Sequence, residues 1–171
     1  MLKWPNRTDS QPFMLIMIAV LLADWAVKSY MLALIFHPPR VIELTSFLNL
    51  APVWNEGISF GLLAEWGTIT RYGISALAVI VSLWLFFQLP FLLKWQKRAA
   101  ALIAGGAIGN MIDRLIYGKV VDFIDFQLGS WHYPAFNVAD AAIFIGVAVW
   151  LISMLYASRH QNKEKDKPDE A

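Results

Sequence analysis

The sequence has no cysteine, only three histidines and few charged residues. The lack of cysteine excludes disulfide bridges, a cysteine nucleophile and a cysteine-ligated metal. The histidines, His37, His132 and His160, are scattered along the chain, so we predict neither a metal site nor a cofactor. Charged residues make up 16% of the chain, whereas a soluble domain usually carries about 25%. No basic stripe interleaved with aromatic residues is present, which argues against nucleic-acid binding.

Apolar residues dominate the composition, at 58% of the 171 residues. A helix needs about 20 mostly apolar residues to cross a bilayer. Four segments meet that requirement, at about 13–36, 72–93, 99–116 and 138–156, the third being the shortest. The sequence therefore predicts an all-α membrane protein with four transmembrane helices. Residues 1–158 form one predicted membrane domain, and the polar residues 159–171 form a predicted disordered cytoplasmic tail.

The basic residues are distributed unequally on the two sides of these segments. One side has nine, which are Lys3, Arg7, Lys94, Lys97, Arg98, Arg159, Lys163, Lys165 and Lys167. The other side has Arg40, Arg71 and Lys119. Because lysine and arginine accumulate on the cytoplasmic side, both termini are predicted to be cytoplasmic. Loops 37–71 and 117–137 then face outward, and apolar runs at 41–44 and 47–54 favour short strands on the membrane surface.

Ionisable residues inside the apolar segments are the next feature, because each costs a few kcal/mol to bury in hydrocarbon, about 2.5–3.5 on insertion scales. Asp24 and Lys28 are one helical turn apart and can form an ion pair on one face. This pair could serve helix packing alone. Alternatively, Lys28, which is nearer the outer surface, could reach toward polar residues there.

The third segment combines small residues with a polar end. Ala101, Gly105 and Gly109 recur every four residues, which allows another helix to approach closely. Gly106 lies on an adjacent face and could bring a substrate near the helix backbone. Asn110, Asp113 and Arg114 follow at the outer boundary, where one interpretation pairs Asp113 with a snorkelling Arg114.

The outer loops supply further polar residues near the same depth. Asn55 and Gly57 are typical turn residues, but the Asn55 amide could also bind a substrate backbone. Asp122 and Asp125 stand among apolar residues, and burial would raise the pKa of whichever is enclosed. In the fourth segment, Asn137 is a good N-cap and Asp140 suits the positive end of the helix dipole, which does not exclude a catalytic role for Asp140. The topology places Asp113, Arg114, Asp122 and Asp140 together at the outer rim.

Two carboxylates at one depth without metal ligands suggest an aspartic dyad. One carboxylate would act as a general base on water while the other, protonated, polarises the scissile carbonyl. Other hydrolytic chemistries lack their motifs, because the sequence has neither His-Glu-x-x-His nor Gly-x-Ser-x-Gly. A Gly-x-Gly-Asp motif, typical of presenilin-like proteases, is also missing.

Five motifs in this order resemble those of the bacterial lipoprotein signal peptidases, also called signal peptidase II or prolipoprotein signal peptidase, over nearly the whole chain. They are Asp24-x-x-x-Lys28, Asn55-Glu56-Gly57-Ile58-Ser59-Phe60, Gly105-Gly106-Ala107-Ile108-Gly109-Asn110-Met111-Ile112-Asp113-Arg114, Val121-Asp122-Phe123 and Phe136-Asn137-x-Ala139-Asp140. The polar first residues and the charged tail are the parts least tied to the family.

The resemblance implies an aspartic endopeptidase of the bacterial cytoplasmic (inner) membrane, with its active site at the extracytoplasmic face. Such an enzyme removes the signal peptide of a prolipoprotein by cutting before a diacylglyceryl-modified cysteine. Asp122 and Asp140 would be the catalytic dyad. Substrate binding or dyad support would come from Asp24, Lys28, Asn55, Gly57, Gly106, Asn110, Asp113, Arg114 and Asn137. The expected partners are lipidated prolipoproteins and membrane lipids, globomycin-type peptides would inhibit, and we expect a monomer.

Two other classes of protein place carboxylates in membrane segments. An ion or proton transporter would need polar residues along a whole path, but the second segment offers only Ser75, Ser82 and Gln88. A structural or assembly subunit would tolerate the loss of any one aspartate.

Overall fold

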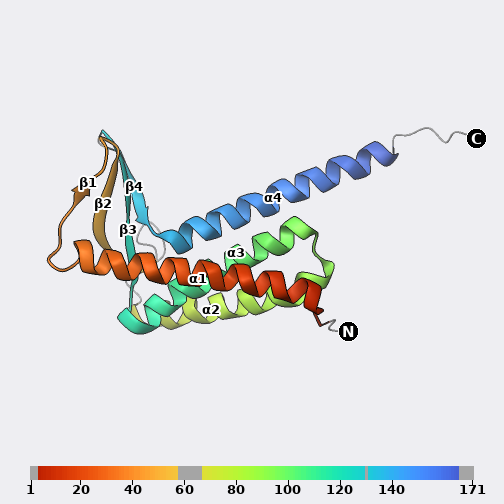
Figure 1. Ribbon diagram of the computed structural model, residues 1–171, viewed down its shortest axis with the longest axis horizontal. Coiled ribbons are helices and arrows are strands. Elements are labelled where there is room, and N and C mark those ends of the chain that lie inside the picture. Colours follow the sequence, from red (N-terminus) through yellow and green to blue (C-terminus); the bar gives the residue numbers. More distant parts are fainter. Residues whose placement is uncertain (1–3, 58–66, 130, 166–171) are drawn as a thin grey trace, which may run out of the picture.

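The computed structural model describes residues 4–57, 67–129 and 131–165. The α-helices are α1 (Arg7–Ile35), α2 (Gly67–Gln88), α3 (Lys94–Tyr117) and α4 (Val138–Lys165), with a short 3₁₀ helix η3 (Leu89–Phe91) after α2. The strands are β1 (Ile42–Glu43), β2 (Leu48–Asn55), β3 (Val120–Leu128) and β4 (Trp131–Phe136). Helices α1, α2 and α3 lie side by side, α4 diverges from them toward its C-terminal end, and a small sheet lies at one end of the bundle (Figure 1).

All four long helices are long and apolar enough to cross a membrane, which confirms the predicted number of spans. Helix α3 differs from the others because 56% of its most apolar stretch is buried inside the protein, against 11–22% for the other three. Helix α3 packs against α1, α2 and α4. Its lower hydropathy therefore reflects a central position, where neighbouring helices shield it from lipid.

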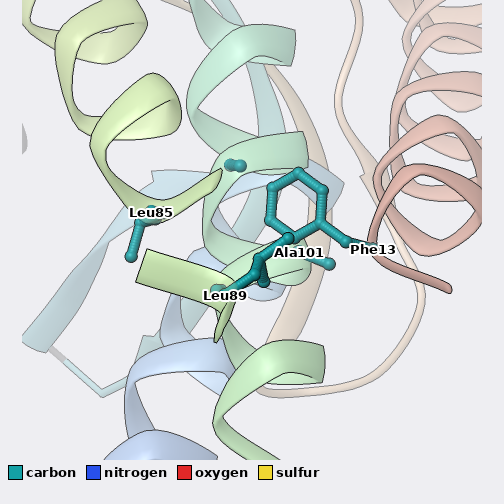
Figure 2. Packing of buried hydrophobic residues seen from close by; sticks show 6 residues of the cluster. Phe13, Leu85, Leu89 and Ala101 are labelled. Carbon is teal, nitrogen blue, oxygen red and sulfur yellow. The ribbon is translucent and has the colours of Figure 1, made fainter. Parts of the chain in front are cut away.

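Small residues on α3 allow this close packing. A Cβ atom built on Gly105 would lie 3.0 Å from the Met17 carbonyl oxygen of α1. Buried alanines on the half of α3 distant from the sheet contact Phe13 of α1 and the leucines Leu85 and Leu89 (Figure 2). The predicted small-residue face of α3 thus contacts α1, as its spacing suggested.

The sheet is antiparallel with strand order β1-β2-β3-β4. Strands from both long loops therefore meet in one sheet, and β3 and β4 of the second loop pair with each other. In the register between β2 and β3, Asn55 opposes Val120 and Val53 opposes Asp122. Asn55 is therefore diagonal to Asp122 on one face of the sheet, within reach of a hydrogen bond.

Two helix boundaries differ from the predicted ones. Helix α1 begins at Arg7, where the Asn6 side chain caps it by accepting a hydrogen bond from the Asp9 amide. Helix α4 continues to Lys165, into the part predicted to be a disordered tail. Residues 159–165 are mostly good helix formers, so a helix already started by the apolar segment can extend through them. Residues 166–171 lie outside the described chain.

Candidate active site

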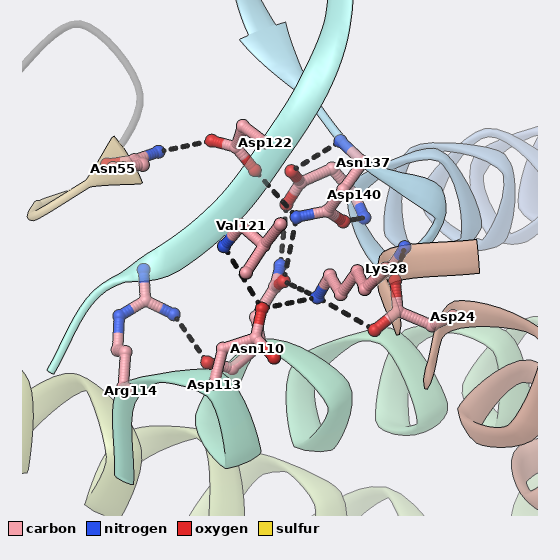
Figure 3. Close-up of polar contacts among 11 residues, drawn as sticks. Asp24, Lys28, Asn55, Asn110, Asp113, Arg114, Val121, Asp122, Asn137 and Asp140 are labelled. Carbon is pink, nitrogen blue, oxygen red and sulfur yellow. Dashed lines mark hydrogen bonds and ion pairs between the residues drawn. The ribbon is translucent and has the colours of Figure 1, made fainter. Parts of the chain in front are cut away.

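A network of polar side chains lies where the helix bundle meets the sheet, and Lys28 is part of it (Figure 3). The Lys28 ammonium is 2.7 Å from Asp24 Oδ2 and 2.9 Å from Asp113 Oδ2. It also donates a hydrogen bond to Asn110 Oδ1 at 3.0 Å. The predicted pair between Asp24 and Lys28 is therefore present. Lys28 also contacts Asp113 and Asn110, so the pair does not serve the packing of α1 alone.

The start of α4 is held by its own cap and by one side chain of α1. Asn137 Oδ1 accepts the Asp140 amide at 2.9 Å, and Asp140 Oδ2 accepts the Asn137 amide at 3.2 Å. This reciprocal cap confirms Asn137 as the N-cap. Asp24 Oδ1 accepts the Ala139 amide at 2.9 Å. Helix α1 thereby fixes the depth at which α4 begins.

The carboxylates of Asp122 and Asp140 are joined through two asparagine amides. Asn137 Nδ2 donates to Asp122 Oδ1 at 2.7 Å and to Asn110 Oδ1 at 3.0 Å. Asn110 Nδ2 donates to Asp140 Oδ1 at 2.7 Å. Asn55 Nδ2 donates to Asp122 Oδ2 at 2.9 Å. With the Asn137 backbone amide on Asp140 Oδ2, each of the four carboxylate oxygens accepts a hydrogen bond, so both groups are fixed in orientation.

Asp122 lies on β3 and is completely buried. Burial, followed by the negative charge of Asp140, raises the pKa of its carboxyl group to about 7. Hydrogen bonds from Asn55 and Asn137 and the charge of Lys28 oppose the rise in the pKa. A carboxyl group that titrates near neutrality can exchange a proton at physiological pH, which suits acid–base chemistry.

Arg114 connects α3 to the loop that follows β2. It donates to the Gly57 carbonyl oxygen at 2.9 Å and to the Asn110 carbonyl oxygen at 3.2 Å. The Gly57 amide in turn donates to Asn55 Oδ1 at 3.1 Å, which leaves the Asn55 amino group directed at Asp122. Arg114 therefore positions Asn55 through the intervening backbone.

Asp113 has different partners from those that adjacency in sequence suggested. Its Oδ2 atom accepts the Val121 amide at 3.1 Å as well as contacting Lys28. The interpretation that pairs Asp113 with Arg114 is therefore replaced, because consecutive helical residues point in directions about 100° apart. Asp113 instead attaches strand β3 to α3 next to Asp122.

Two glycines of α3 allow this arrangement. A Cβ atom on Gly106 would lie 2.3 Å from the Ala139 carbonyl oxygen, and one on Gly109 would lie 2.8 Å from Asp24 Oδ2. The structure thus places Gly106 against the first turn of α4. Its contact partner is the backbone of the helix that carries Asp140.

The remaining candidates lie apart or outside the described chain. Asp125 accepts a hydrogen bond from Asn49 at 3.2 Å and is 3.6 Å from His132, farther along the sheet. Residues Ile58, Ser59 and Phe60 of the predicted loop motif lie outside the described residues. Among the described residues, no three His, Cys, Asp or Glu side chains are grouped as a metal site would require.

Backbone groups are the site components that sequence reasoning missed. The amides of Val121 and Ala139 bind Asp113 and Asp24, and the Gly57 carbonyl binds Arg114. Every residue has such groups, so only the fold can select these three. The one signal that could have indicated them is a carboxylate in or beside an apolar segment, because a buried carboxylate needs hydrogen-bond donors besides its ion pair.

The chain is similar to known proteins over most of its length. A family model described as "Signal peptidase (SPase) II" matches residues 16–156. A protein named "Lipoprotein signal peptidase" from Burkholderia thailandensis is 43% identical over 147 residues, covering 82% of this chain and 85% of that protein. One of the same name from Shewanella oneidensis is 40% identical over 159 residues, covering 91% of each.

Solved structures also resemble the whole chain. One, described as a bacterial membrane enzyme structure at 2.3 Å resolution, has a TM-score of 0.73 and 27% identity, covering 99% of this chain and 97% of that one. A second, described as a bacterial membrane enzyme structure at 1.9 Å resolution, has a TM-score of 0.67 and 29% identity, with coverages of 91% and 97%. Sequence and fold similarity thus extend over the segments that carry the network.

Proposed function

The chain belongs to the signal peptidase II family, and from this premise we propose that it is an aspartic endopeptidase whose dyad is Asp122 and Asp140. One observation carries the proposal. Asp122 and Asp140 are held by the linked amides of Asn110 and Asn137, and each carboxylate oxygen accepts a hydrogen bond. Two fixed carboxyl groups that share one proton can act as acid and base in the same reaction.

We assign the shared proton to Asp122, because the pKa of its carboxyl group lies near 7. Ionised Asp140 then takes a proton from water as the water oxygen attacks the peptide carbonyl carbon. Asp122 gives its proton to the carbonyl oxygen and forms the neutral tetrahedral intermediate. When the C–N bond breaks, Asp140 returns its proton to the leaving nitrogen, and Asp122 recovers its own as the carbonyl forms again.

Lys28 has a structural part in this mechanism. It neutralises one of the two charges on Asp24 and Asp113, which lie beneath the dyad. Its hydrogen bond to Asn110 Oδ1 also fixes the orientation of that amide, so that the Asn110 amino group points at Asp140. Lys28, Asn110 and Asn137 are therefore positioning residues for the dyad.

The proposed substrate is a lipidated prolipoprotein in the bacterial cytoplasmic membrane, cut before its diacylglyceryl cysteine. Both matched relatives are named lipoprotein signal peptidases, which supports this class of substrate. The site lies at the sheet-bearing end of the bundle, which the charge distribution assigns to the extracytoplasmic face. A signal peptide anchored in the bilayer loses much of its positional freedom before reaction. The enzyme acts as a monomer in this proposal, and a globomycin-type peptide would compete for the site.

The test replaces each dyad carboxyl with an amide of nearly equal size. Asp122→Asn and Asp140→Asn should each lower the cleavage rate of a lipidated prolipoprotein by about 10²–10⁴-fold, the usual contribution of a general acid or base. The matched control is Asp125→Asn, three residues from Asp122 on the same strand. Cleavage would be followed by gel shift in reconstituted membranes, with protein levels equalised. If either dyad variant cleaves at the rate of the control, the dyad assignment is wrong.

A further inference from the structure

A cavity lies at the other end of the bundle, away from the sheet. Its volume is about 290 Å³, and it is enclosed by the first turns of α1 and α3. Lys94, Lys97 and Arg98 of α3 line one wall, and Asp9, Phe13 and Ile16 of α1 line the other. None of these residues belongs to the polar network around Asp122.

The basic wall gathers three cations at one helix end. The three cations lie at the start of α3, where the helix dipole is positive, and the first turn of α3 contains no acidic residue. The residue at the N-cap position is Leu93, whose side chain cannot accept a hydrogen bond from the first N–H groups. Positive charge and open N–H donors therefore gather at the same point, which favours binding of an anion.

The protein neutralises only part of this charge. Asp9 forms an ion pair with Lys97. The Arg98 guanidinium lies 4.6 Å from the centre of the Trp95 ring, a contact that holds the group in place while leaving its charge intact. Lys94 and Arg98 thus leave the cavity positively charged.

The opposite wall is apolar and close to lipid. Phe13 is buried and Ile16 is half-buried, and both belong to a helix that exposes Met14, Leu15 and Ile18. Trp4 and Trp95 are largely exposed at this end, as expected of aromatic residues at a membrane interface. A ligand that fits these surroundings has a negatively charged group joined to an apolar part.

We propose that this cavity binds the phosphate headgroup of an anionic phospholipid from the leaflet that this end of the bundle faces. Lys94, Arg98 and the first N–H groups of α3 contact the phosphate, and the acyl chains lie along Phe13 and Ile16. Basic pockets between helices at this depth are suited to such headgroups. A soluble phosphate ester shares the charged group and lacks the apolar part, so the two sources can be separated by experiment.

The experiment uses the full-length protein, purified in detergent and stripped of lipid. Palmitoyl-oleoyl phosphatidylglycerol, the corresponding phosphatidylcholine and glycerol phosphate are titrated separately, and adducts are counted by native mass spectrometry. Phosphatidylglycerol should bind most tightly. Lys94→Gln combined with Arg98→Gln should weaken its binding about thirtyfold, whereas Arg7→Gln, an exposed cation nearby that does not line the cavity, should change it little.

A third variant is expected to bind phosphatidylglycerol more tightly than the parent. Asp9→Asn removes the carboxylate that competes for Lys97, so it should tighten phosphatidylglycerol binding by about fivefold. Each variant must keep the thermal unfolding midpoint of the parent, and Lys94→Arg with Arg98→Lys should retain binding. The proposal is overturned if phosphatidylcholine or glycerol phosphate binds as tightly as phosphatidylglycerol. It is also overturned if the double variant and Arg7→Gln weaken phosphatidylglycerol binding to the same extent.

Discussion

The two ends of the helix bundle each contain a lysine and an aspartate that connect α1 to α3, but the two sites differ in burial. At the sheet end, the side chain of Lys28 is 4% exposed and lies between Asp24 and Asp113. At the other end, the side chain of Lys97 is 26% exposed and pairs with Asp9. A charge that has lost its water needs a complete set of partners, whereas a half-exposed charge keeps water as an alternative partner.

This difference indicates what each end can do. The sheet end has its carboxylates, amides and lysine fixed by mutual hydrogen bonds, which suits a reaction that needs preset geometry. The other end keeps cations only partly neutralised and close to solvent, which suits a site that exchanges ligands. The following predictions test that contrast, in order of decreasing expected effect.

The largest effect is expected for Lys28→Met. The variant leaves Asp24 and Asp113 buried without their cation, and breaking a buried pair by removing one partner usually costs about 3–5 kcal/mol. Unfolding in detergent, followed by tryptophan fluorescence, would measure this loss. Adding Asp24→Asn to the variant should restore part of it, because the second change removes one uncompensated charge. If Lys28→Met lowered the free energy of unfolding by less than Lys97→Met does, the difference in burial would not explain how the two ends differ.

A smaller effect is expected for Gly106→Ala. The new Cβ atom would lie 2.3 Å from the Ala139 carbonyl oxygen, so α4 must move and carry Asp140 with it. Overpacking of this kind usually costs about 1–3 kcal/mol, and cleavage activity should fall as well. The matched control is Gly73→Ala, where a Cβ atom would meet nothing within 4 Å. That variant should be neutral or slightly stabilising in the same unfolding assay. Equal behaviour of the two variants would contradict the close contact between α3 and α4.

The dependence of the cleavage rate on pH tests the electrostatics of the sheet end. Below a pH of about 7 the Asp122 carboxyl keeps its proton, because burial and the negative charge of Asp140 raise its pKa to about that value. Above that pH, Asp122 loses its proton, so the proposed mechanism has no general acid. The value of kcat/KM should therefore fall about tenfold for each pH unit above 7. A profile that stays flat from pH 6 to 9, under conditions where the protein remains folded, would exclude Asp122 as the proton donor.

The smallest effect is expected for Lys97→Met. The pair with Asp9 is partly exposed, and such pairs contribute about 0–1 kcal/mol. Its unfolding midpoint should lie close to that of the parent, and prolipoprotein cleavage should continue at the parental rate. If Lys97→Met lowered the free energy of unfolding as much as Lys28→Met does, the proposed difference between the sheet end and the other end would be wrong.

Local spacing was enough to predict several parts of the fold and of the candidate site. Four apolar runs predicted the four helices. A separation of four residues predicted the pair between Asp24 and Lys28, and a separation of three allowed the cap between Asn137 and Asp140. In each case the partners lie on one helical turn, so their proximity depends only on the helix that contains them.

Contacts between distant segments were harder to predict. The second outer loop forms strands β3 and β4, although its alternation of apolar and polar residues is imperfect. Asp113 and Arg114 are adjacent in sequence but bind different segments. The family motifs, rather than any depth argument, separated Asp122 from Asp125, and the structure places Asp125 with Asn49 and His132, apart from the dyad candidates.

The sequence by itself determined that this protein has four helices long and apolar enough to span a membrane, a lysine–aspartate pair in the first of them and a capped aspartate at the start of the last. Only the tertiary structure decided that Asn55 faces Asp122, that Asn110 and Asn137 connect the two carboxylates, and that Gly106 lies against Ala139. The physical reason is the range of the interactions. Helix formation and capping depend on residues within one turn, whereas the network depends on strand register and helix packing across the whole bundle.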